Sequence, residues 1–281
     1  MAAQHLKGAG IDVTVLDKAN RPGGRMATRQ FEGAIFDYGA QFFTARSERF
    51  AAFQRAWETS GLVRHWEQDR FIGQSGMNSI CAHLSQGLDL RCSVKVRQIY
   101  ETAGHWTLET DFDETIVADA LIITSPVPQT LAMLDRTIPE LDDVAYDRCL
   151  ALMAILGAPH DFEVDGERIA WVADNQRRGI SPLANSVTIH SGPQFSCDNW
   201  EVNAEEVAQR MLGNVAATAW KLHRWKYAKP ITQYKDDCFE LASSTPLFLA
   251  GDAFGGPRVE GAALSGLAAA ERLLARLSSR P

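Results

Sequence analysis

Two short motifs near the N-terminus have the residue types of a nucleotide site. Asp17 follows the apolar run 13–16, and Gly23 and Gly24 precede Arg25. In a doubly wound α/β fold, a carboxylate at the end of the second strand accepts hydrogen bonds from ribose hydroxyls. Glycines let the backbone approach a phosphate, and a guanidinium can neutralise it. The spacing predicts contacts with the ribose and pyrophosphate of a dinucleotide; the alternative for Asp17 is an aspartate in a surface turn.

A second candidate motif lies near the C-terminus. Gly251 and Asp252 follow the apolar run 247–250, and a helix rich in small residues is predicted over 259–277. A carboxylate at a strand end suits a polyol such as ribityl, and a helix N-terminus stabilises negative charge that develops on a flavin ring. The alternative is a turn followed by a well-packed terminal helix.

The elements that must position these motifs indicate a parallel sheet whose first strand is missing. Residues 2–6 are predicted to end a helix and residues 11–16 to form a strand, yet no strand and no Gly-x-Gly-x-x-Gly turn precede them. Residues 120–124 are continuously apolar, as in a buried parallel strand. We therefore expect either that the natural protein starts about 15–20 residues before Met1, or that this chain is a nonfunctional remnant.

The remaining patterns complete an α/β protein with a second sheet. Helices are predicted over 48–58, 77–84 and 203–212, an antiparallel meander over 94–117, and antiparallel strands at 150–156, 168–172, 186–189 and 219–225. The predicted fold class is α/β, with a discontinuous, N-terminally truncated Rossmann-like domain and a second domain with a mixed or antiparallel sheet. The first comprises residues 1–46, 86–128 and 238–281, and the second comprises residues 47–85 and 129–237.

Composition narrows the class of protein. The chain has 281 residues, 46% of them hydrophobic, and a net charge of -7 with scattered basic residues, which argues against nucleic-acid binding. Five cysteines without a Cys-x-x-Cys pair indicate reduced thiols and no metal site. Because no signal peptide and no apolar run of about 20 residues is present, a membrane span is not expected. These features predict a cytoplasmic enzyme with a small-molecule substrate.

Three motifs together resemble bacterial renalase-like proteins of the monoamine oxidase-like flavoprotein superfamily. They are Asp-Tyr-Gly-Ala-Gln-Phe-Phe at 37–43, His-Arg-Trp-Lys-Tyr-Ala at 223–228 and Gly-Pro-Arg-Val-Glu-Gly-Ala at 256–262. The likeness runs from Met1 to about Leu274. It implies that the discontinuous domain binds FAD noncovalently and that the second domain binds substrate.

The resemblance also implies which residues contact FAD. Asp17 is expected to bind the adenosine ribose, Val96 the adenine through its backbone, and Asp252 the ribityl chain. Gln41 and Phe42 are expected at the isoalloxazine edge. The full predicted set is Asp17, Lys18, Gly24, Arg25, Met26, Gln41, Phe42, Val96, Gly251, Asp252, Val259, Glu260, Gly261 and Ala262.

The activity that the resemblance implies is oxidation of dihydronicotinamide isomers of NAD(P)H, by hydride transfer to flavin N5, with O2 as the reoxidant. A flavin amine oxidase and a noncatalytic truncated flavoprotein fold are the alternatives. Because hydride transfer to a flavin needs little acid–base help, no catalytic side chain is expected.

Five residues are predicted to contact the substrate: Phe43, Arg46, Asn175, His190 and Arg258. The two arginines would grip a phosphate or carboxamide, and the alternative for them is a surface salt bridge. For His190 the alternative is a hydrogen-bonded core histidine. Of the seven tryptophans, Trp171 is the one expected to face the substrate pocket.

Overall fold

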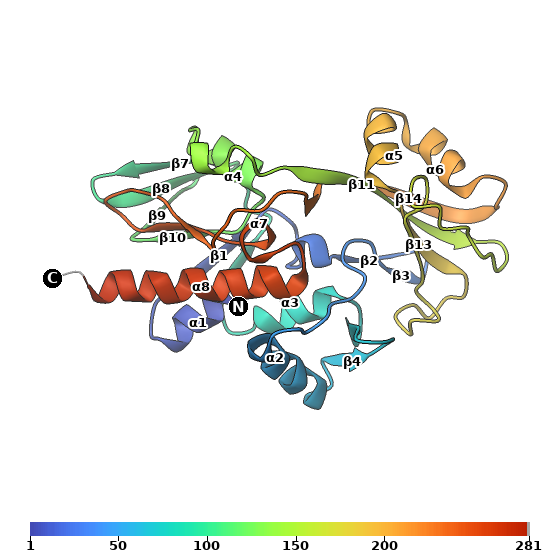
Figure 1. The fold of residues 1–281 in the computed structure, drawn as a ribbon, viewed down its shortest axis with the longest axis horizontal. Helices are drawn as coiled ribbons and strands as arrows, with labels where there is room; N and C mark the ends of the chain where they lie inside the picture. The colour runs from blue at the N-terminus through green and yellow to red at the C-terminus, as the bar shows by residue number, and fades with distance from the viewer. Residues whose placement is uncertain (280–281) are drawn as a thin grey trace. The chain divides into compact units, whose positions relative to one another are not determined.

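The computed structural model describes residues 1–279, which form two compact units (Figure 1). Unit 1 consists of Met1–Pro22, Ala82–Ala145 and the C-terminal segment from Pro230. Unit 2 consists of Gly23–Cys81 and Tyr146–Lys229. The chain therefore enters each unit more than once, and the predicted α/β class with a second antiparallel sheet is confirmed.

The boundaries of the units differ from the predicted domain boundaries in four segments. Residues 23–46 pack with unit 2, whereas residues 82–85, 129–145 and 230–237 pack with unit 1. Helix α3 (Asn78–Leu84) begins in unit 2 and ends in unit 1. The segment that carries Gly24, Arg25 and Gln41 thus folds onto the second sheet.

Unit 1 contains two pairs of short parallel strands, of which β16 is buried throughout. Strand β1 (Thr14–Asp17) pairs in parallel with β6 (Asp89–Cys92), and β10 (Leu121–Ile123) pairs in parallel with β16 (Leu247–Leu249). On its other side β16 pairs with β15 (Phe239–Glu240) in the antiparallel sense. Because β1 and β16 run parallel to their partners, Asp17 and Gly251 both stand at carboxyl ends of parallel strands, where α/β folds place their ligands.

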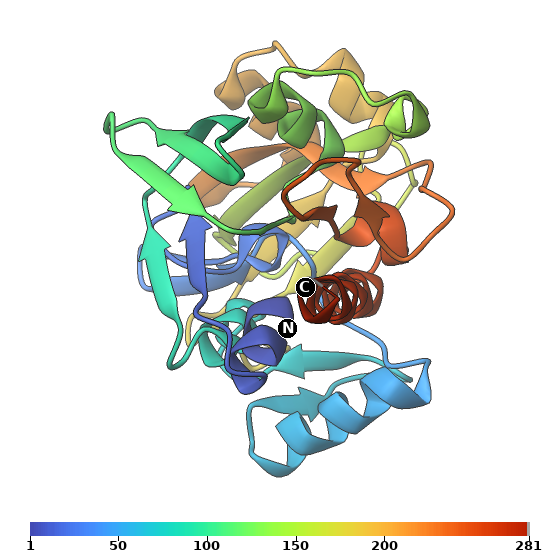
Figure 2. The same cartoon turned by 90° about the vertical axis from the view of Figure 1, so that its left-hand side faces the viewer.

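The helices of unit 1 cover these strands. The long helix α8 (Val259–Ser278) packs beside α1 (Ala2–Gly8), as Figure 2 shows with α8 nearly end-on. Their shared core contains Leu6, Phe248 and Leu273. The antiparallel meander β7 (Val96–Thr102), β8 (His105–Thr110) and β9 (Thr115–Ala118) and the short helices α4 (Val127–Leu134), Pro139–Leu141 and α7 (Asp252–Gly255) complete the unit.

Unit 2 is built on a four-stranded sheet in the order β12, β13, β11, β14. These strands span Trp171–Asp174, Ser186–His190, Tyr146–Leu156 and Ala217–Pro230. Leu150, Leu152 and Ala154 point to the core shared with α5 (Pro193–Asp198) and α6 (Ala204–Leu212), whereas Ala151 and Met153 join another core. Both faces of β11 are therefore buried over residues 150–156, which explains the unbroken apolar sequence of this part of the strand.

The second core of unit 2 lies under a hairpin that the sequence analysis does not predict. Strands β2 (Thr28–Phe31) and β3 (Ala34–Asp37) pair around Glu32 and Gly33, whose φ angles are 47° and 76°. Positive φ at both positions is the geometry of a tight hairpin turn, which glycine readily adopts. Helix α2 (Glu48–Thr59), the 3-10 turn Gly24–Met26 and the strands β4 (Val63–His65) and β5 (Phe71–Gly73) complete the unit.

One predicted strand begins later than expected. Strand β12 starts at Trp171 rather than at Arg168. The side chain of Asp165 accepts hydrogen bonds from the backbone N–H groups of Glu167 and Ile169, each at 2.9 Å. This side chain holds residues 165–169 in a turn, since aspartate competes with strand pairing in this way.

Candidate functional site

Three predicted cofactor contacts lie on strands of unit 1 or directly after them. Asp17 ends β1, and its Oδ1 accepts a hydrogen bond from Ala19 N at 2.8 Å. Its Oδ2 has no partner among the described residues, so one carboxylate oxygen remains for a ligand. Lys18 is exposed, with Nζ 3.4 Å from Gln129 Oε1. Val96 begins β7, the edge strand of the meander, which leaves one side of that strand unpaired within residues 1–279.

The C-terminal motif forms a loop between β16 and α8. Asp252 is 9% exposed and Glu260 7% exposed, whereas Arg258 is exposed at the start of α8. Arg258, the N-cap residue of this 20-residue helix, forms no side-chain capping hydrogen bond. Because the first N–H groups of a helix carry partial positive charge, Val259–Ala262 present a surface that suits anionic oxygens.

Glycines allow the loop and the helix to approach closely. A Cβ on Gly261 would lie 2.3 Å from the carbonyl oxygens of Gly255 and Gly256, and one on Gly255 would lie 2.1 Å from Gly261 O. Gly251 has a φ of 131°, and its N–H donates to Ser265 Oγ at 2.9 Å. The backbone of the loop therefore packs closely on the start of α8, where the ribityl and pyrimidine contacts are predicted. Such a glycine-rich backbone surface beside a helix N-terminus fits a flavin.

In unit 2 the glycine–arginine motif forms the 3-10 turn Gly24–Met26. The Arg25 guanidinium donates to the carbonyl oxygens of Tyr227 at 3.2 Å and Ala228 at 3.5 Å, both on β14. Arg25 O accepts from Ala40 N at 2.7 Å, and a Cβ on Gly39 would lie 2.0 Å from it. Met26 Sδ lies 3.8 Å from Cys81 Sγ. These contacts join the motif to the segment that carries Gln41.

Gln41 belongs to a buried polar network that the sequence analysis does not predict. Its Nε2 donates to Asp37 O at 2.7 Å and Gly39 O at 3.1 Å, and its Oε1 accepts from the Arg178 guanidinium at 2.9 Å. Arg178 also donates to Gln41 O and lies 3.3 Å from Asp37 Oδ2. Both polar atoms of the Gln41 side chain and its backbone oxygen thus form hydrogen bonds inside unit 2.

The network is centred on a buried ion pair. Asp37 is 0% and Arg178 2% exposed. Burial raises the pKa of the Asp37 carboxyl, while Arg178 and hydrogen bonds from Thr28 and Met77 oppose the rise. Burial lowers the pKa of Arg178, which Asp37 opposes. Only tertiary contacts distinguish Arg178 from the exposed Arg177 beside it. No local pattern in the sequence could therefore have predicted that Arg178 is buried.

Two predicted substrate residues form hydrogen bonds within unit 2, and Asn175 belongs to the same network because its Oδ1 accepts from Arg178 at 3.3 Å. Asn175 is fully buried, and its Nδ2 donates to Ser186 O at 3.2 Å and Thr188 Oγ1 at 3.0 Å. His190 Nε2 donates to Tyr38 O at 3.1 Å, and burial lowers the pKa of His190 to about 4. His190 is therefore neutral at pH 7, and because its side chain is half-buried, its contact with a substrate stays a prediction.

The adjacent phenylalanines point in different directions. Phe43 is 2% exposed and packs on Phe50 and Phe71, with ring centroids 5.9 and 5.7 Å away. It presents almost no surface to a substrate, because its backbone pairs with Phe71 and directs the ring into the core. Phe42 is half-buried and contacts Trp66 and Trp171 instead. Arg46 is exposed just before the Ser47 cap of α2.

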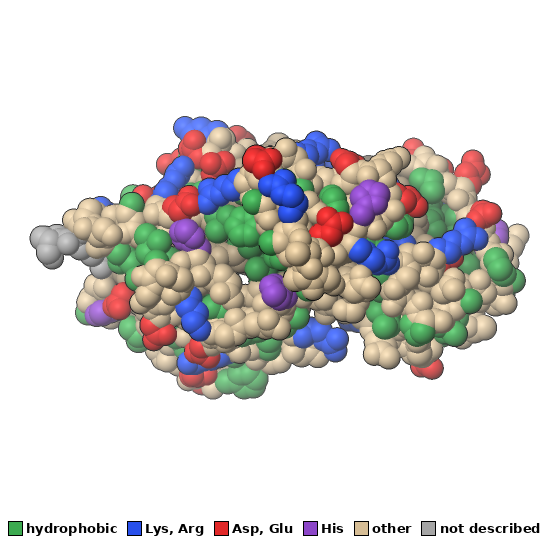
Figure 3. Space-filling model, turned by 90° about the horizontal axis from the view of Figure 1, so that it is seen from below, with side chains coloured by type: hydrophobic (Ala, Val, Ile, Leu, Met, Phe, Trp, Pro, Cys, Tyr) green, Lys and Arg blue, Asp and Glu red, His purple; other side chains and the backbone are tan. Residues whose placement is uncertain are grey.

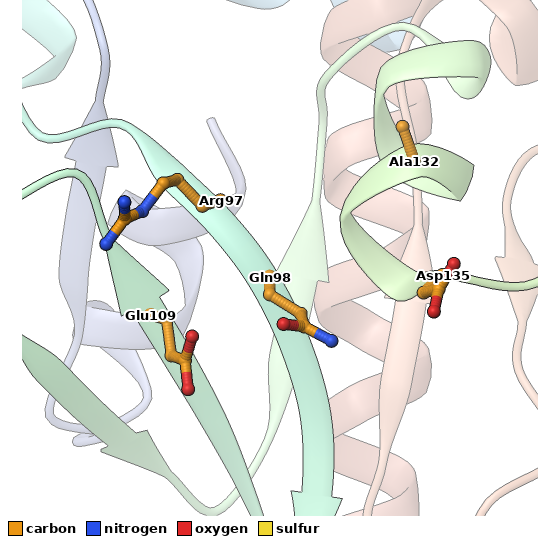
Figure 4. A pocket seen from close by; sticks show the side chains of 5 residues that line it. All are labelled: Arg97, Gln98, Glu109, Ala132 and Asp135. Carbon is orange, nitrogen blue, oxygen red and sulfur yellow. The ribbon is translucent and has the colours of Figure 1, made fainter. Parts of the chain in front are cut away.

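The pocket drawn in Figure 4 is distinct from these contacts. It has a volume of about 500 Å³ and is lined by Arg97, Gln98, Glu109, Ala132 and Asp135 of unit 1. The Arg97 guanidinium pairs with Asp113 at 2.5 Å, and Glu109 accepts from Tyr100 at 3.0 Å. Because none of the predicted site residues lines it, we do not assign it to the cofactor or to the substrate.

The face in Figure 3 shows basic and acidic side chains mixed together rather than gathered into one basic patch. This distribution agrees with the scattered charges of the sequence. No helix among residues 1–279 combines the length and the hydrophobicity that a membrane span requires.

Comparison with known proteins supports the predicted resemblance. The model of the family "Flavin containing amine oxidoreductase" matches residues 1–56. Renalase of Mus musculus is 24% identical over 286 residues, which cover 85% of this chain and 84% of renalase.

Solved structures share the fold. A putative protoporphyrinogen oxidase from Exiguobacterium has a TM-score of 0.73 at 13% identity, covering 98% of this chain and 95% of that one. Wild-type putrescine oxidase bound to putrescine has a TM-score of 0.66 at 14% identity, covering 98% and 96%. The chain is therefore similar in sequence to renalase, and over residues 1–56 to the flavin-containing amine oxidoreductases. Its fold is that of the two oxidases.

Proposed function

We propose that the chain is an FAD-dependent oxidoreductase. The observation that carries the proposal is the start of α8, where Arg258 forms no side-chain capping hydrogen bond and glycines allow close contact with the Gly251–Gly256 loop. The partial positive charge of this helix end suits the flavin oxygens that become negative on reduction. Asp17, with one unpartnered carboxylate oxygen, is proposed to bind the adenosine ribose.

The proposed donor is a dihydronicotinamide isomer of NAD(P)H, with O2 as the proposed electron acceptor. When bound, FAD would supply the redox chemistry, which is transfer of a hydride from the donor and of its two electrons to O2, giving hydrogen peroxide. The protein then needs only to bind and orient the donor. The similarity to renalase supports this donor.

Amine oxidation is the second candidate. The match to the flavin-containing amine oxidoreductases and the fold shared with putrescine oxidase favour it. Both candidates use the same cofactor and differ in the charge of the donor, which is anionic for a dinucleotide and cationic for an amine.

Flavin reduction under anaerobic conditions tests the proposal. Purified protein mixed with FAD is expected to retain the flavin, whose visible absorbance should bleach with an aged NADH sample and not with putrescine. Bleaching by putrescine alone would select the second candidate. Bleaching by neither donor would refute both, and failure to retain FAD would indicate a noncatalytic fold.

A matched pair of variants tests the cofactor contact. Asp17→Ala is expected to weaken FAD binding roughly ten- to a hundredfold, since a hydrogen bond to a charged group contributes about 1.5–3 kcal/mol. Asp12→Ala, at an exposed position five residues earlier, should leave FAD affinity unchanged. Equal affinities for the two variants would contradict the ribose assignment.

A further inference from the structure

We infer that Phe42, Trp66, Arg70 and Trp171 form a binding site in unit 2 for a planar ring that carries a carboxylate or another anionic oxygen acceptor. We call these four residues the Arg70 cluster. The sequence analysis singles out Phe42 and Trp171 separately, but neither Trp66 nor Arg70. For the choice of substrate, the inference rests on the proposed function.

The cluster is an aromatic surface with an arginine stacked on it. The ring centroid of Phe42 lies 5.6 Å from that of Trp171 and 6.3 Å from that of Trp66. The guanidinium carbon of Arg70 lies 4.5 Å from the centroid of Phe42 and 5.4 Å from that of Trp171. All four side chains are half-buried, so the packed rings also keep part of their surface exposed.

Backbone hydrogen bonds hold the cluster in place. Trp66 N donates to Arg70 O at 2.9 Å across the turn between β4 and β5. The bridge between Phe43 and Phe71, with N–O distances of 2.9 and 2.8 Å, holds the neighbouring Phe42 against that turn. The arrangement is therefore preorganised, which reduces the entropy lost on binding.

The cluster has N–H donors and positive charge without matching acceptors. Arg70 forms no ion pair within residues 1–279, although Glu67 and Asp69 belong to the same turn. Trp171 Nε1 is buried without an acceptor among the described residues. Arg178 lies 5.2 Å over the Trp66 ring, and its buried Nε likewise has no acceptor in the part of the chain described. A buried donor without a partner costs about 1–3 kcal/mol, so such groups call for an explanation.

A flat anionic ligand supplies the hydrogen-bond acceptors and the negative charge that the cluster lacks. Its ring can stack on the aromatic faces, and its oxygens can accept from the planar fork of Arg70. An ammonium group would instead meet the positive charge of Arg70, which no carboxylate neutralises by ion pairing in residues 1–279. The cluster therefore selects anionic donors over amines.

Binding of small probes tests the inference without any flavin reaction. The purified chain, with its tryptophans labelled with 15N, is titrated with nicotinate, nicotinamide or benzylamine while the indole N–H resonances are followed. Trp171→Phe identifies the signal of Trp171. Nicotinate is expected to shift this signal and to bind at least tenfold more tightly than benzylamine, with nicotinamide in between.

Variants of two stacked arginines separate recognition from folding. Arg70→Met should weaken nicotinate binding at least tenfold, and Arg70→Lys, which keeps the charge and loses the fork, should weaken it less. Arg29→Met is the control, since Arg29 stacks on Tyr38 at 5.0 Å in the same unit. Unchanged nicotinate affinity in Arg70→Met, or benzylamine binding as tight as nicotinate, would overturn the inference. Either result would leave the proposed FAD chemistry intact, because that is tested by flavin bleaching.

Discussion

Arg178→Met is expected to destabilise the protein by about 3–5 kcal/mol, because Asp37 would remain buried as an uncompensated charge. Asp37 is 0% exposed and 3.3 Å from the Arg178 guanidinium. The substitution also removes the donor to Gln41 Oε1, and an unsatisfied buried acceptor costs about 1–3 kcal/mol. Since a domain is typically stable by about 5–15 kcal/mol, this loss is a large fraction of the total.

The neighbouring residue provides the control. The Arg177 side chain is 74% exposed and lies 3.4 Å from Asp174, and an exposed pair of this kind contributes about 0–1 kcal/mol. Urea unfolding at pH 7, followed by tryptophan fluorescence, measures the stability of Arg177→Met and Arg178→Met. Adding Asp37→Asn to Arg178→Met should recover part of the loss, because no buried charge then remains. Equal losses for the two single variants, or no recovery in the double variant, would refute the reasoning.

Three further predictions concern stability. The pKa of His190 is about 4 in the folded protein and near 6.5 in the unfolded chain, so the unfolded chain binds the proton first as the pH falls. The free energy of unfolding should therefore drop by up to ~3 kcal/mol between pH 6.5 and pH 4. His190→Asn should flatten this part of the curve of unfolding free energy against pH, and an unchanged slope would contradict the assignment. Gly261→Ala should lower the Tm well below that of Gly266→Ala, whose Cβ would have Ala2 Cβ at 3.7 Å as its nearest neighbour. Equal Tm values would argue against the close loop–helix contact. Asn203→Ala should lower the free energy of unfolding in urea by about 1 kcal/mol, because Asn203 Oδ1 accepts a hydrogen bond from Glu206 N at 2.9 Å. A change below 0.3 kcal/mol, roughly the measurement error, would show that the cap is unimportant.

The helices and turns whose sequence signals lie within a few neighbouring residues have bounds close to the predicted ones. Helix α2 was expected at 48–58 and spans Glu48–Thr59, and α6 begins after its predicted Asn203 cap. The meander turns at Ala103 and Gly104, where the alternation of its strands breaks. Spacing, caps and turn residues act within a few positions of the chain, so a sequence pattern suffices to locate these elements.

The sequence by itself determined the α/β class, the antiparallel second sheet and the positions of Asp17 and Gly251 at the ends of parallel strands, because these follow from hydrophobic periodicity and from glycine. Only the tertiary structure decided which polar side chains are buried and what they contact. Asn175 and Phe43 were expected at the substrate and are buried, whereas Arg178 joins Asp37 and Gln41 across more than 130 positions of the chain. Burial and pairing of charge depend on contacts between distant segments, and no local pattern encodes those contacts.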